Sequence, residues 1–219
     1  MNNLDTLSSN INTISTKEVQ NNITNIMSNR LCHHKVRSLF SLRELLKNEI
    51  EHYLEIGVHN GCSMSYILSS EYKINCYGID LFEDSFYPDK LQLDPIKKKL
   101  DIVNKHNHSF ELIKGNSTNT EIINKVKNMN IKFDIIFIDG DHTYEGVKLD
   151  FFNYASFLKD DGLLIFDDYN KAPTNKGVFK FINDHLINNS NYEHIQFYDN
   201  EHKGEFNDGI IIFKPINKT

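Results

Sequence analysis

The chain has few of the residues that build disulfide frameworks, zinc sites or phosphate-binding surfaces. Its 219 residues include only three cysteines, Cys32, Cys62 and Cys76, and these show no C-x-x-C spacing. We therefore expect reduced intracellular thiols, and neither a disulfide framework nor a structural zinc site. Arginine is also scarce and the formal net charge is −6. Binding nucleic acid requires a basic surface, so this composition argues against nucleic acid as a partner.

Long apolar runs are missing as well. No apolar stretch reaches the roughly 18 residues that a membrane span needs, so we expect no membrane partner. The polar segment Met1–Ser9 lacks the apolar core of an export signal, which favours a cytoplasmic location. Hydrophobic residues make up 39% and charged residues 25% of the chain, which is typical of a soluble globular domain.

The pattern of apolar residues divides the chain into two parts. Residues 1–47 are predicted to form an N-terminal extension, partly disordered and then helical, that serves as a lid or a dimer contact. Residues 48–219 alternate short apolar runs with amphipathic stretches, which indicates five β-α units followed by a hairpin. We therefore predict an α/β domain with a seven-stranded, mostly parallel sheet, a C-terminal hairpin and helices on both faces.

Each element of this domain follows from a local pattern. Phe133–Asp139 is the clearest strand, because its continuous apolar run is typical of a strand covered on both faces. The other strands are predicted at His52–Ile56, Asn75–Asp80, Phe110–Lys114, Gly162–Phe166, His194–Tyr198 and Gly209–Lys214. Helices are predicted at Cys62–Ser69, Asp94–His106, Asn119–Met129, Tyr144–Leu158 and Val178–Ile187. Ligands of such sheets bind beyond the carboxyl ends of the strands, so the residues that follow each strand are the informative ones.

The first strand runs into a glycine-containing turn. Gly57 and Gly61 permit a sharp turn into a helix whose free amides favour a negative group. Their G-x-x-x-G spacing differs from the G-x-G-x-x-G of dinucleotide enzymes, and Val58 adds bulk where a pyrophosphate needs bare backbone. An ordinary glycine turn is the alternative interpretation.

Two further strand ends carry polar groups. Asp80 ends the second strand, where an acid can accept hydrogen bonds from both hydroxyls of a ribose. Asn116 and Ser117 follow the third strand and are suited to contacting the edge of an adenine. Both sets have a structural alternative, because Asp, Asn and Ser also cap helices. The aromatic-rich segment 81–88 would cap the adenine, line the acceptor pocket or form a surface loop.

Carboxylates gather after the fourth and fifth strands. Asp139 ends the fourth strand, and Asp167 and Asp168 end the fifth. Like charges packed together are costly unless they share a proton or a cation. A hard divalent ion such as Mg²⁺ would relieve this cost, since it prefers oxygen ligands. The alternative is that these acids are solvated, cap helices or hold loops.

His142 lies three residues after Asp139. A histidine suits general-base catalysis, because the pKa of its side chain is ordinarily near neutrality. A lone histidine in a loop is more often structural or merely solvated. Its place on the ligand side of the sheet nevertheless favours a catalytic role.

Taken in order, these segments resemble class I S-adenosylmethionine-dependent methyltransferases, which have a Rossmann-like fold. The I-D-G-x-H-x-Y-E segment at 138–145 and the D-D-Y segment at 167–169 are most similar to metal-dependent small-molecule and sugar O-methyltransferases of the macrocin type. The resemblance covers Glu51 to Lys214. It implies that the cofactor is S-adenosylmethionine. The implied cofactor site comprises Glu55, Gly57, Val58, Gly61, Asp80, Leu81, Asn116, Ser117 and Asp139.

The resemblance also implies roles at the two acidic strand ends. Asp139, Asp167 and Asp168 would hold a divalent cation, and His142 would act as the catalytic base together with Asp139. Catechol and caffeoyl-CoA enzymes carry a lysine where this chain has His142 and an asparagine where it has Asp168. A flat catechol acceptor is therefore disfavoured, and a sugar or nucleotide-sugar diol is the preferred small-molecule acceptor.

Three other functions remain open at this point. The chain could be a metal-independent methyltransferase that acts on another nucleophile, which chelator-insensitive turnover would indicate. It could be an oxidoreductase like cephalosporin hydroxylase on the same scaffold, although no His-x-Asp…His iron triad is evident. It could also be a module that binds the cofactor without catalysis.

Overall fold

A computed structural model describes residues 4–5, 10, 17–27, 37–83, 92–169, 176–198 and 209–216. Within these ranges the elements follow the order expected from the sequence. The helices are α2 (Lys17–Met27), α3 (Arg37–Leu46), α4 (Cys62–Leu68), α5 (Leu93–Val103), α6 (Thr120–Asn128), α7 (Tyr144–Tyr154) and α8 (Lys176–His185). The strands are β1 (His52–Ile56), β2 (Asn75–Asp80), β3 (Ser109–Lys114), β4 (Phe133–Ile138), β5 (Leu158–Phe166), β6 (Tyr192–Tyr198) and β7 (Gly209–Pro215).

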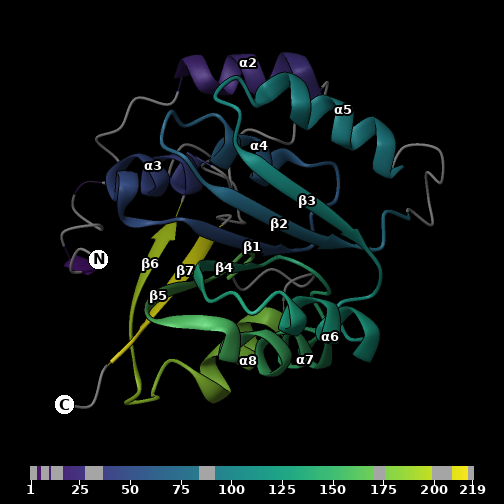
Figure 1. Ribbon diagram of the computed structural model, residues 1–219. Helices are drawn as coiled ribbons and strands as arrows, with labels where there is room; N and C mark the ends of the chain where they lie inside the picture. The colour runs from purple at the N-terminus through teal and green to yellow at the C-terminus, as the bar shows by residue number, and fades with distance from the viewer. Residues whose placement is uncertain are drawn as a thin grey trace.

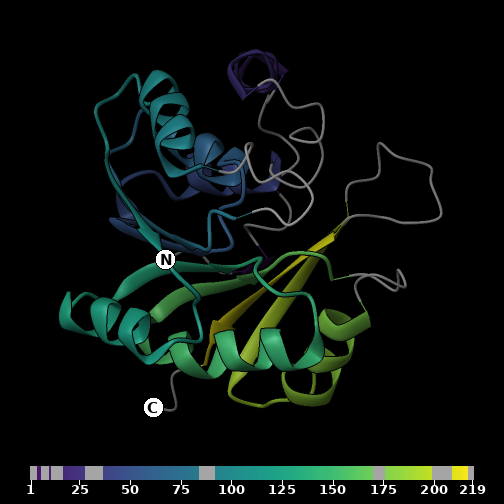
Figure 2. The same ribbon diagram turned by 90° about the vertical axis from the view of Figure 1, so that its right-hand side faces the viewer.

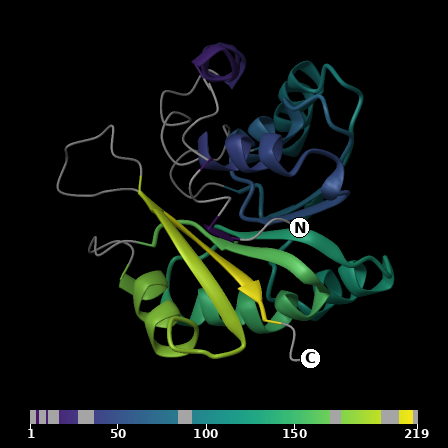
Figure 3. The ribbon, with the colours of Figure 1, turned by 90° about the vertical axis from the view of Figure 1, so that its left-hand side faces the viewer.

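The seven strands form one sheet in the order β3-β2-β1-β4-β5-β7-β6. Strands β1 to β5 pair in parallel, and β7 pairs antiparallel with both β5 and β6. Helices α2 to α5 cover one face of the sheet, and α6 to α8 cover the other (Figure 1). Views from the two sides show the same three layers, with the β6–β7 hairpin at one edge of the sheet (Figures 2 and 3). The predicted fold class, with its C-terminal hairpin, is confirmed.

Each face of the sheet has its own hydrophobic core. Side chains alternate between the faces of a strand, so consecutive apolar residues serve both cores. Along β4, Ile135 and Phe137 pack with α2 to α5, whereas Ile136 and Ile138 pack with α6 to α8. All four are at most 3% exposed, which explains the continuous apolar run of this strand.

Strand β5 begins four residues earlier than predicted, which is the largest such difference among the strands. The chain leaves α7 through a short 3₁₀ helix at Ala155–Phe157 and enters β5 at Leu158, four residues before Gly162. The pairing of β4 with β5 shifts register here, because Phe133 pairs with Leu158 and Ile135 with Leu163. The bulged residues are polar or glycine, so a search for apolar runs does not detect them as part of a strand.

Helix α3 is integrated into the core. Its residues Leu39 and Leu42 are fully buried, as is Arg43. The guanidinium of Arg43 donates hydrogen bonds to the backbone carbonyls of Tyr72 and Lys73, and burial lowers its pKa. The predicted boundary at residue 47 stays a prediction, and most of the segment 1–16 lies outside the described residues.

The expectation about the cysteines is wrong at one position. Cys62, at the start of α4, is disulfide-bonded. A disulfide depends on the spatial approach of two side chains, which spacing in the sequence does not reveal. Cys76 in β2 is a buried free thiol, and burial raises its pKa. Among the described helices, none combines the length and the apolar character needed to cross a bilayer.

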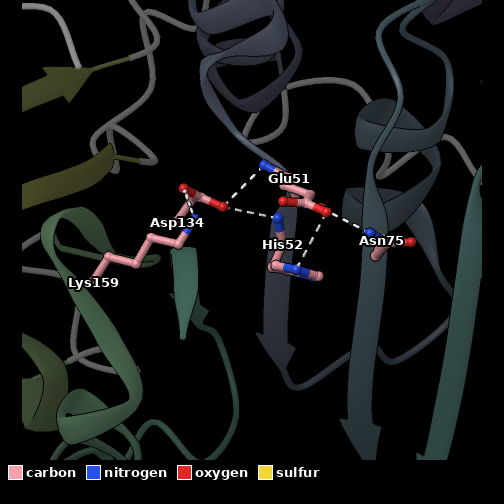
Figure 4. Close-up of polar contacts among 5 residues, drawn as sticks. All are labelled: Glu51, His52, Asn75, Asp134 and Lys159. Atoms are coloured by element: carbon pink, nitrogen blue, oxygen red, sulfur yellow. Dashed lines mark hydrogen bonds and ion pairs between the residues drawn. The ribbon is translucent and has the colours of Figure 1, made fainter. Parts of the chain in front are cut away.

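A buried carboxylate joins three strands at the amino-terminal edge of the parallel sheet (Figure 4). Asp134 in β4 is 2% exposed, and its Oδ2 atom accepts hydrogen bonds from the N–H groups of Glu51 and His52, each at 2.9 Å. Its Oδ1 atom lies 2.7 Å from Nζ of Lys159 in β5. The charge is therefore fully paired, and the contacts fix the start of β1 against β4 and β5.

We expect Asp134→Ala to lower the free energy of unfolding by roughly 3 kcal/mol, because it leaves two buried N–H groups and a lysine without their partner. Asp134→Asn retains an acceptor and should cost less. Lys159→Met is the matched control, since Lys159 is half-buried and its loss should cost about 1 kcal/mol. Urea denaturation measures all three, and a loss below about 0.5 kcal/mol in Asp134→Ala would contradict this role.

Candidate functional site

Polar residues meet at the opposite, carboxyl-terminal edge of the parallel strands. The first residues after β1, β4 and β5 are Gly57, Asp139 and Asp167. Each donates its N–H group to a carbonyl of the neighbouring strand, at 2.9, 2.8 and 3.1 Å respectively. The regular geometry of the sheet thus continues one residue beyond these strands. It fixes the starting positions of the three loops that follow β1, β4 and β5.

A cavity of about 750 Å³ opens at this edge of the sheet. It is lined by residues at the ends of β1 and β2, by residues in the loops that follow β1, β2, β3 and β4, and by Glu145, Gly146, Leu149 and Asp150 of α7. Its volume is within the range of roughly 300–1,000 Å³ that is common for small-molecule sites. We call this cavity the acidic pocket, because six of its described lining residues are acids and none of those described is lysine or arginine. The acids are Asp80, Glu83, Asp139, Asp141, Glu145 and Asp150.

Gly57 allows two loops to meet in the acidic pocket. Its φ is +91°, and a Cβ atom at this position would lie 2.0 Å from the backbone oxygen of Asp139. Any side chain here would therefore collide with backbone that cannot move aside. The glycine that follows β1 is required for the contact with the loop that follows β4.

Asp80 is fixed by the backbone around it. Its Oδ2 atom accepts a hydrogen bond from the N–H group of His59 at 2.7 Å, and its Oδ1 atom accepts one from Phe82 at 2.6 Å. His59 and Phe82 both have left-handed φ values, 49° and 48°. Each carboxylate oxygen has a second lone pair, so Asp80 can still accept hydrogen bonds from a ligand diol. Leu81 lies beside it in the pocket lining and is 48% exposed.

The loop after β3 lines the same pocket with Asn116 and Ser117. The Oδ1 atom of Asn116 accepts hydrogen bonds from the backbone N–H and the hydroxyl of Thr118, at 2.9 and 2.8 Å. The hydroxyl of Ser117 donates to Oδ1 of Asp150 at 2.6 Å. Both residues lie where the sequence places them, but these polar atoms already have partners within the protein.

Three of the predicted cofactor-binding residues are not part of the pocket lining. These are Glu55, Val58 and Gly61, which are buried. The carboxylate of Glu55 accepts hydrogen bonds from the hydroxyl of Tyr53, at 2.8 Å, and from that of Ser63. Burial raises the pKa of Glu55 to about 8. Their direct contact with a cofactor remains a prediction.

A group of possible metal ligands lies at one side of the pocket. The Nε2 atom of His142 is 3.3 Å from Oδ1 of Asp139, and its Nδ1 atom is 3.1 Å from Oδ2 of Asp168. One ligand atom from each of the three residues lies within 4.8 Å of the others. Asp168 has a left-handed φ of 56°, which aspartate tolerates better than most residues. Two carboxylates and an imidazole are a suitable donor set for a divalent cation.

Asp167 differs from the two other predicted ligands. It is 4% exposed, and its Oδ1 atom accepts a hydrogen bond from the N–H group of Asp168 at 2.8 Å. The structure groups Asp139 and Asp168 with His142 instead of with Asp167. A ligand role for Asp167 stays a prediction.

Sequence reasoning missed several lining residues, above all Asp150 in α7. A signal for it exists, because Val147, Asp150, Phe151 and Tyr154 form one buried stripe at helical spacing, and an acid is unexpected there. Part of the aromatic segment 81–88, from residue 84 onward, lies outside the described residues.

We expect Glu55→Gln to change how stability depends on pH. A buried carboxyl whose pKa is raised from 4.5 to about 8 stabilises the fold at low pH, and this contribution is lost as pH rises toward 8. The neutral variant should gain up to about 4 kcal/mol of unfolding free energy over the parent protein at pH 8, and under about 1 kcal/mol at pH 5. Denaturant titration at the two pH values tests this. The exposed Glu51→Gln is the control, and parallel pH profiles for the parent protein and Glu55→Gln would refute the expectation.

Comparisons with known proteins identify related sequences and similar folds. An uncharacterized protein of Acanthamoeba polyphaga mimivirus is 31% identical over 134 residues, which are 59% of this chain and 58% of that protein. The chain thus spans less than two thirds of the length of this relative. An O-methyltransferase from Bacillus cereus, solved with S-adenosylhomocysteine, superimposes with a TM-score of 0.56 over 81% of this chain and 80% of its own, at 16% identity.

A TDP-rhamnose 3′-O-methyltransferase of calicheamicin biosynthesis has a similar fold. It has a TM-score of 0.59 and 15% identity, covering 98% of this chain and 93% of its own. At such identities the structural comparisons show the fold alone. The methyltransferase domain family itself matches residues 54–169, which run from β1 through the loops of the acidic pocket to Tyr169. This match spans more than half of the chain, and the protein therefore belongs to the methyltransferase domain family.

Proposed function

We propose that the protein is an S-adenosylmethionine-dependent methyltransferase that methylates a hydroxyl oxygen of a small-molecule acceptor with the help of a divalent cation. The observation that carries this proposal is the acidic pocket. It brings Asp80 and Asp139, from the ends of β2 and β4, into one cavity of a chain that belongs to the methyltransferase family.

The charge of the acidic pocket favours S-adenosylmethionine over a dinucleotide. S-adenosylmethionine carries a positive sulfonium and a positive ammonium group, whereas NAD carries a negatively charged pyrophosphate. Six acids and no lysine or arginine line the described part of the pocket, so a cationic ligand is attracted and an anionic one is repelled. In this proposal Asp80 accepts hydrogen bonds from the two ribose hydroxyls, and the loop of Asn116 and Ser117 contacts the adenine.

The residues beside the pocket fit a divalent cation. Asp139 and Asp168 would supply oxygen ligands, and His142 lies between them. A bound cation would offset the mutual repulsion of the carboxylates. Mg²⁺ prefers oxygen ligands, whereas Mn²⁺ also accepts imidazole nitrogen, so both are tested below. Asp167 would complete the set if its carboxylate turned toward the other two.

The reaction is an in-line transfer in which the acceptor oxygen forms a bond to the methyl carbon as the bond from carbon to sulfur breaks. A divalent cation, when bound, lowers the pKa of the acceptor hydroxyl. His142 accepts the hydroxyl proton at Nε2, and Asp168 orients its imidazole through Nδ1. Asp80 and the loop after β3 hold the adenosyl group, so that the methyl carbon stays in contact with the acceptor oxygen.

A sugar or nucleotide-sugar diol is the acceptor class we propose. Two neighbouring hydroxyls can approach one cation together, and a protein of similar fold acts on a TDP-sugar. A mass-spectrometric screen of sugar acceptors for the gain of one methylene unit identifies the acceptor. A homodimer contact through the N-terminal helices and a cytoplasmic location belong to the same proposal.

Binding of S-adenosylhomocysteine tests the cofactor assignment directly. We expect isothermal titration calorimetry to show binding of this ligand and no binding of NAD. Asp80→Ala should weaken the affinity roughly 10- to 150-fold, because it removes charge-assisted hydrogen bonds to the ribose. Asp101→Ala, at an exposed position of α5, is the control and should bind like the parent protein. Unchanged affinity in Asp80→Ala would remove this residue from the site.

His142→Ala separates catalysis from metal binding. If His142 is the base, kcat should fall by roughly 10²- to 10⁴-fold while the affinities for Mn²⁺ and S-adenosylhomocysteine stay unchanged. Turnover of the parent protein should stop in EDTA and return with Mg²⁺ or Mn²⁺. If His142→Ala instead loses Mn²⁺ affinity, the imidazole is a metal ligand and the base lies elsewhere. Full turnover of the parent protein in EDTA would exclude the metal-assisted mechanism.

A further inference from the structure

A buried carboxylate in α7 has no role in the mechanism described above. Asp150 is 1% exposed and lies on the stripe of α7 that packs against the sheet, between Val147 and Phe151. An apolar residue would stabilise this position more, because burying a carboxylate is costly. Burial raises the pKa of Asp150 to about 6, against the lowering effect of the Ser117 hydroxyl, and nearby Asp141 raises it further. The fold alone therefore does not explain an acid here.

Asp150 instead forms a hydrogen bond with the loop that follows β3. Its Oδ1 atom accepts the hydrogen bond from the hydroxyl of Ser117, at 2.6 Å. One turn further along α7, the hydroxyl of Tyr154 donates to the backbone carbonyl of Ser117 at 2.7 Å. Two side chains of one helix thus hold both the side chain and the backbone of Ser117.

The other carboxylate oxygen of Asp150 faces the loop that follows β4. A Cβ atom added to Gly140 would lie 2.9 Å from Oδ2 of Asp150. The absence of a side chain at Gly140 thus leaves room for this carboxylate. Asp150 touches the loops on both sides of the acidic pocket, and it is itself part of the lining.

We propose that Asp150 is a positioning residue of the cofactor site, which sets the affinity for the adenosyl group by holding Ser117 and the loop around it. The Ser117 hydroxyl is then a tether to α7, and the adenine is contacted by the backbone of residues 115–118 and by the side-chain amide of Asn116. This assignment rests on the proposed function, because the ligand is the adenosyl group of S-adenosylmethionine.

The test removes the hydrogen bond between Ser117 and Asp150 from either side and compares both variants with a matched control. Asp150→Ala and Ser117→Ala each remove the hydrogen bond, Asp150→Asn retains an acceptor for the Ser117 hydroxyl, and Ser109→Ala changes an exposed serine of β3. Isothermal titration with adenosine and with S-adenosylhomocysteine gives the affinities, at a temperature where circular dichroism shows every variant folded. Mn²⁺ titration reports on the other side of the pocket.

We expect Asp150→Ala and Ser117→Ala to lower the affinities for adenosine and for S-adenosylhomocysteine by the same factor, roughly 5- to 30-fold. Their double variant should be no weaker than the worse single variant, because both remove one interaction. Asp150→Asn should stay within about 3-fold of the parent protein, and Ser109→Ala should match it. The KM for S-adenosylmethionine should rise by the same factor with kcat nearly unchanged, and Mn²⁺ affinity should not change.

The outcomes separate this inference from the proposed function. A parent protein that binds neither adenosyl ligand contradicts the proposed function itself. A parent protein that binds, with Asp150→Ala and Ser117→Ala binding equally well, overturns the inference alone. A parallel loss of Mn²⁺ affinity also overturns it, because it indicates general loosening of the pocket. If Asp150→Ala does not fold, Ser117→Ala decides, since it removes the same hydrogen bond from the loop side.

Discussion

The accumulation of carboxylates at one edge of the sheet is the constraint on which the rest of the site depends. Parallel strands all end at the same edge, so acids that follow β2, β4 and β5 are brought together by topology alone. Without a ligand, backbone N–H groups and one imidazole stabilise this charge. Asp80 accepts from two N–H groups and Asp167 from one, while His142 lies between Asp139 and Asp168. A site that gathers negative charge in this way is suited to cations, and both proposed ligands are cationic.

The two edges of the sheet use aspartate differently. At the amino-terminal edge, Asp134 is 2% exposed, receives two backbone N–H groups and pairs with Lys159. At the carboxyl-terminal edge, Asp80 also receives two backbone N–H groups, but it lines an open cavity. Lys159 neutralises the charge of Asp134, so that this carboxylate has no capacity left for a ligand. Asp80 has no such cation beside it in the described pocket lining, and its remaining lone pairs are available to a ligand. Similar local hydrogen bonding thus serves stability at one edge and ligand binding at the other.

The strands could be predicted well from the sequence, because buried parallel strands are continuous apolar runs. The ends of the strands then determine where the following loops begin. Asp80, Asn116, Ser117 and Asp139, which the sequence assigns to a cofactor site, accordingly line one pocket in the structure. The sequence could not place Glu55, because a carboxylate at a strand end can point to a ligand or into the core, and tertiary packing decides which. The start of β5 was not predicted, because the residues of its bulge are polar or glycine. The disulfide of Cys62 was not predicted either, because it depends on the spatial approach of two side chains.

The loop that follows β4 connects the two halves of the proposed site. On one side, its first residue touches Gly57 so closely that no side chain fits between them. Its second residue, Gly140, touches Asp150, which holds Ser117 at the adenine end of the pocket. Its fourth residue, His142, lies with Asp139 at the metal end. Four consecutive residues thus border both the proposed cofactor half and the proposed metal half of the site. Gly57 and Gly140 leave the space that lets this one short segment serve both halves, with Asp139 and His142 at the proposed cation and Gly140 beside the Asp150 tether.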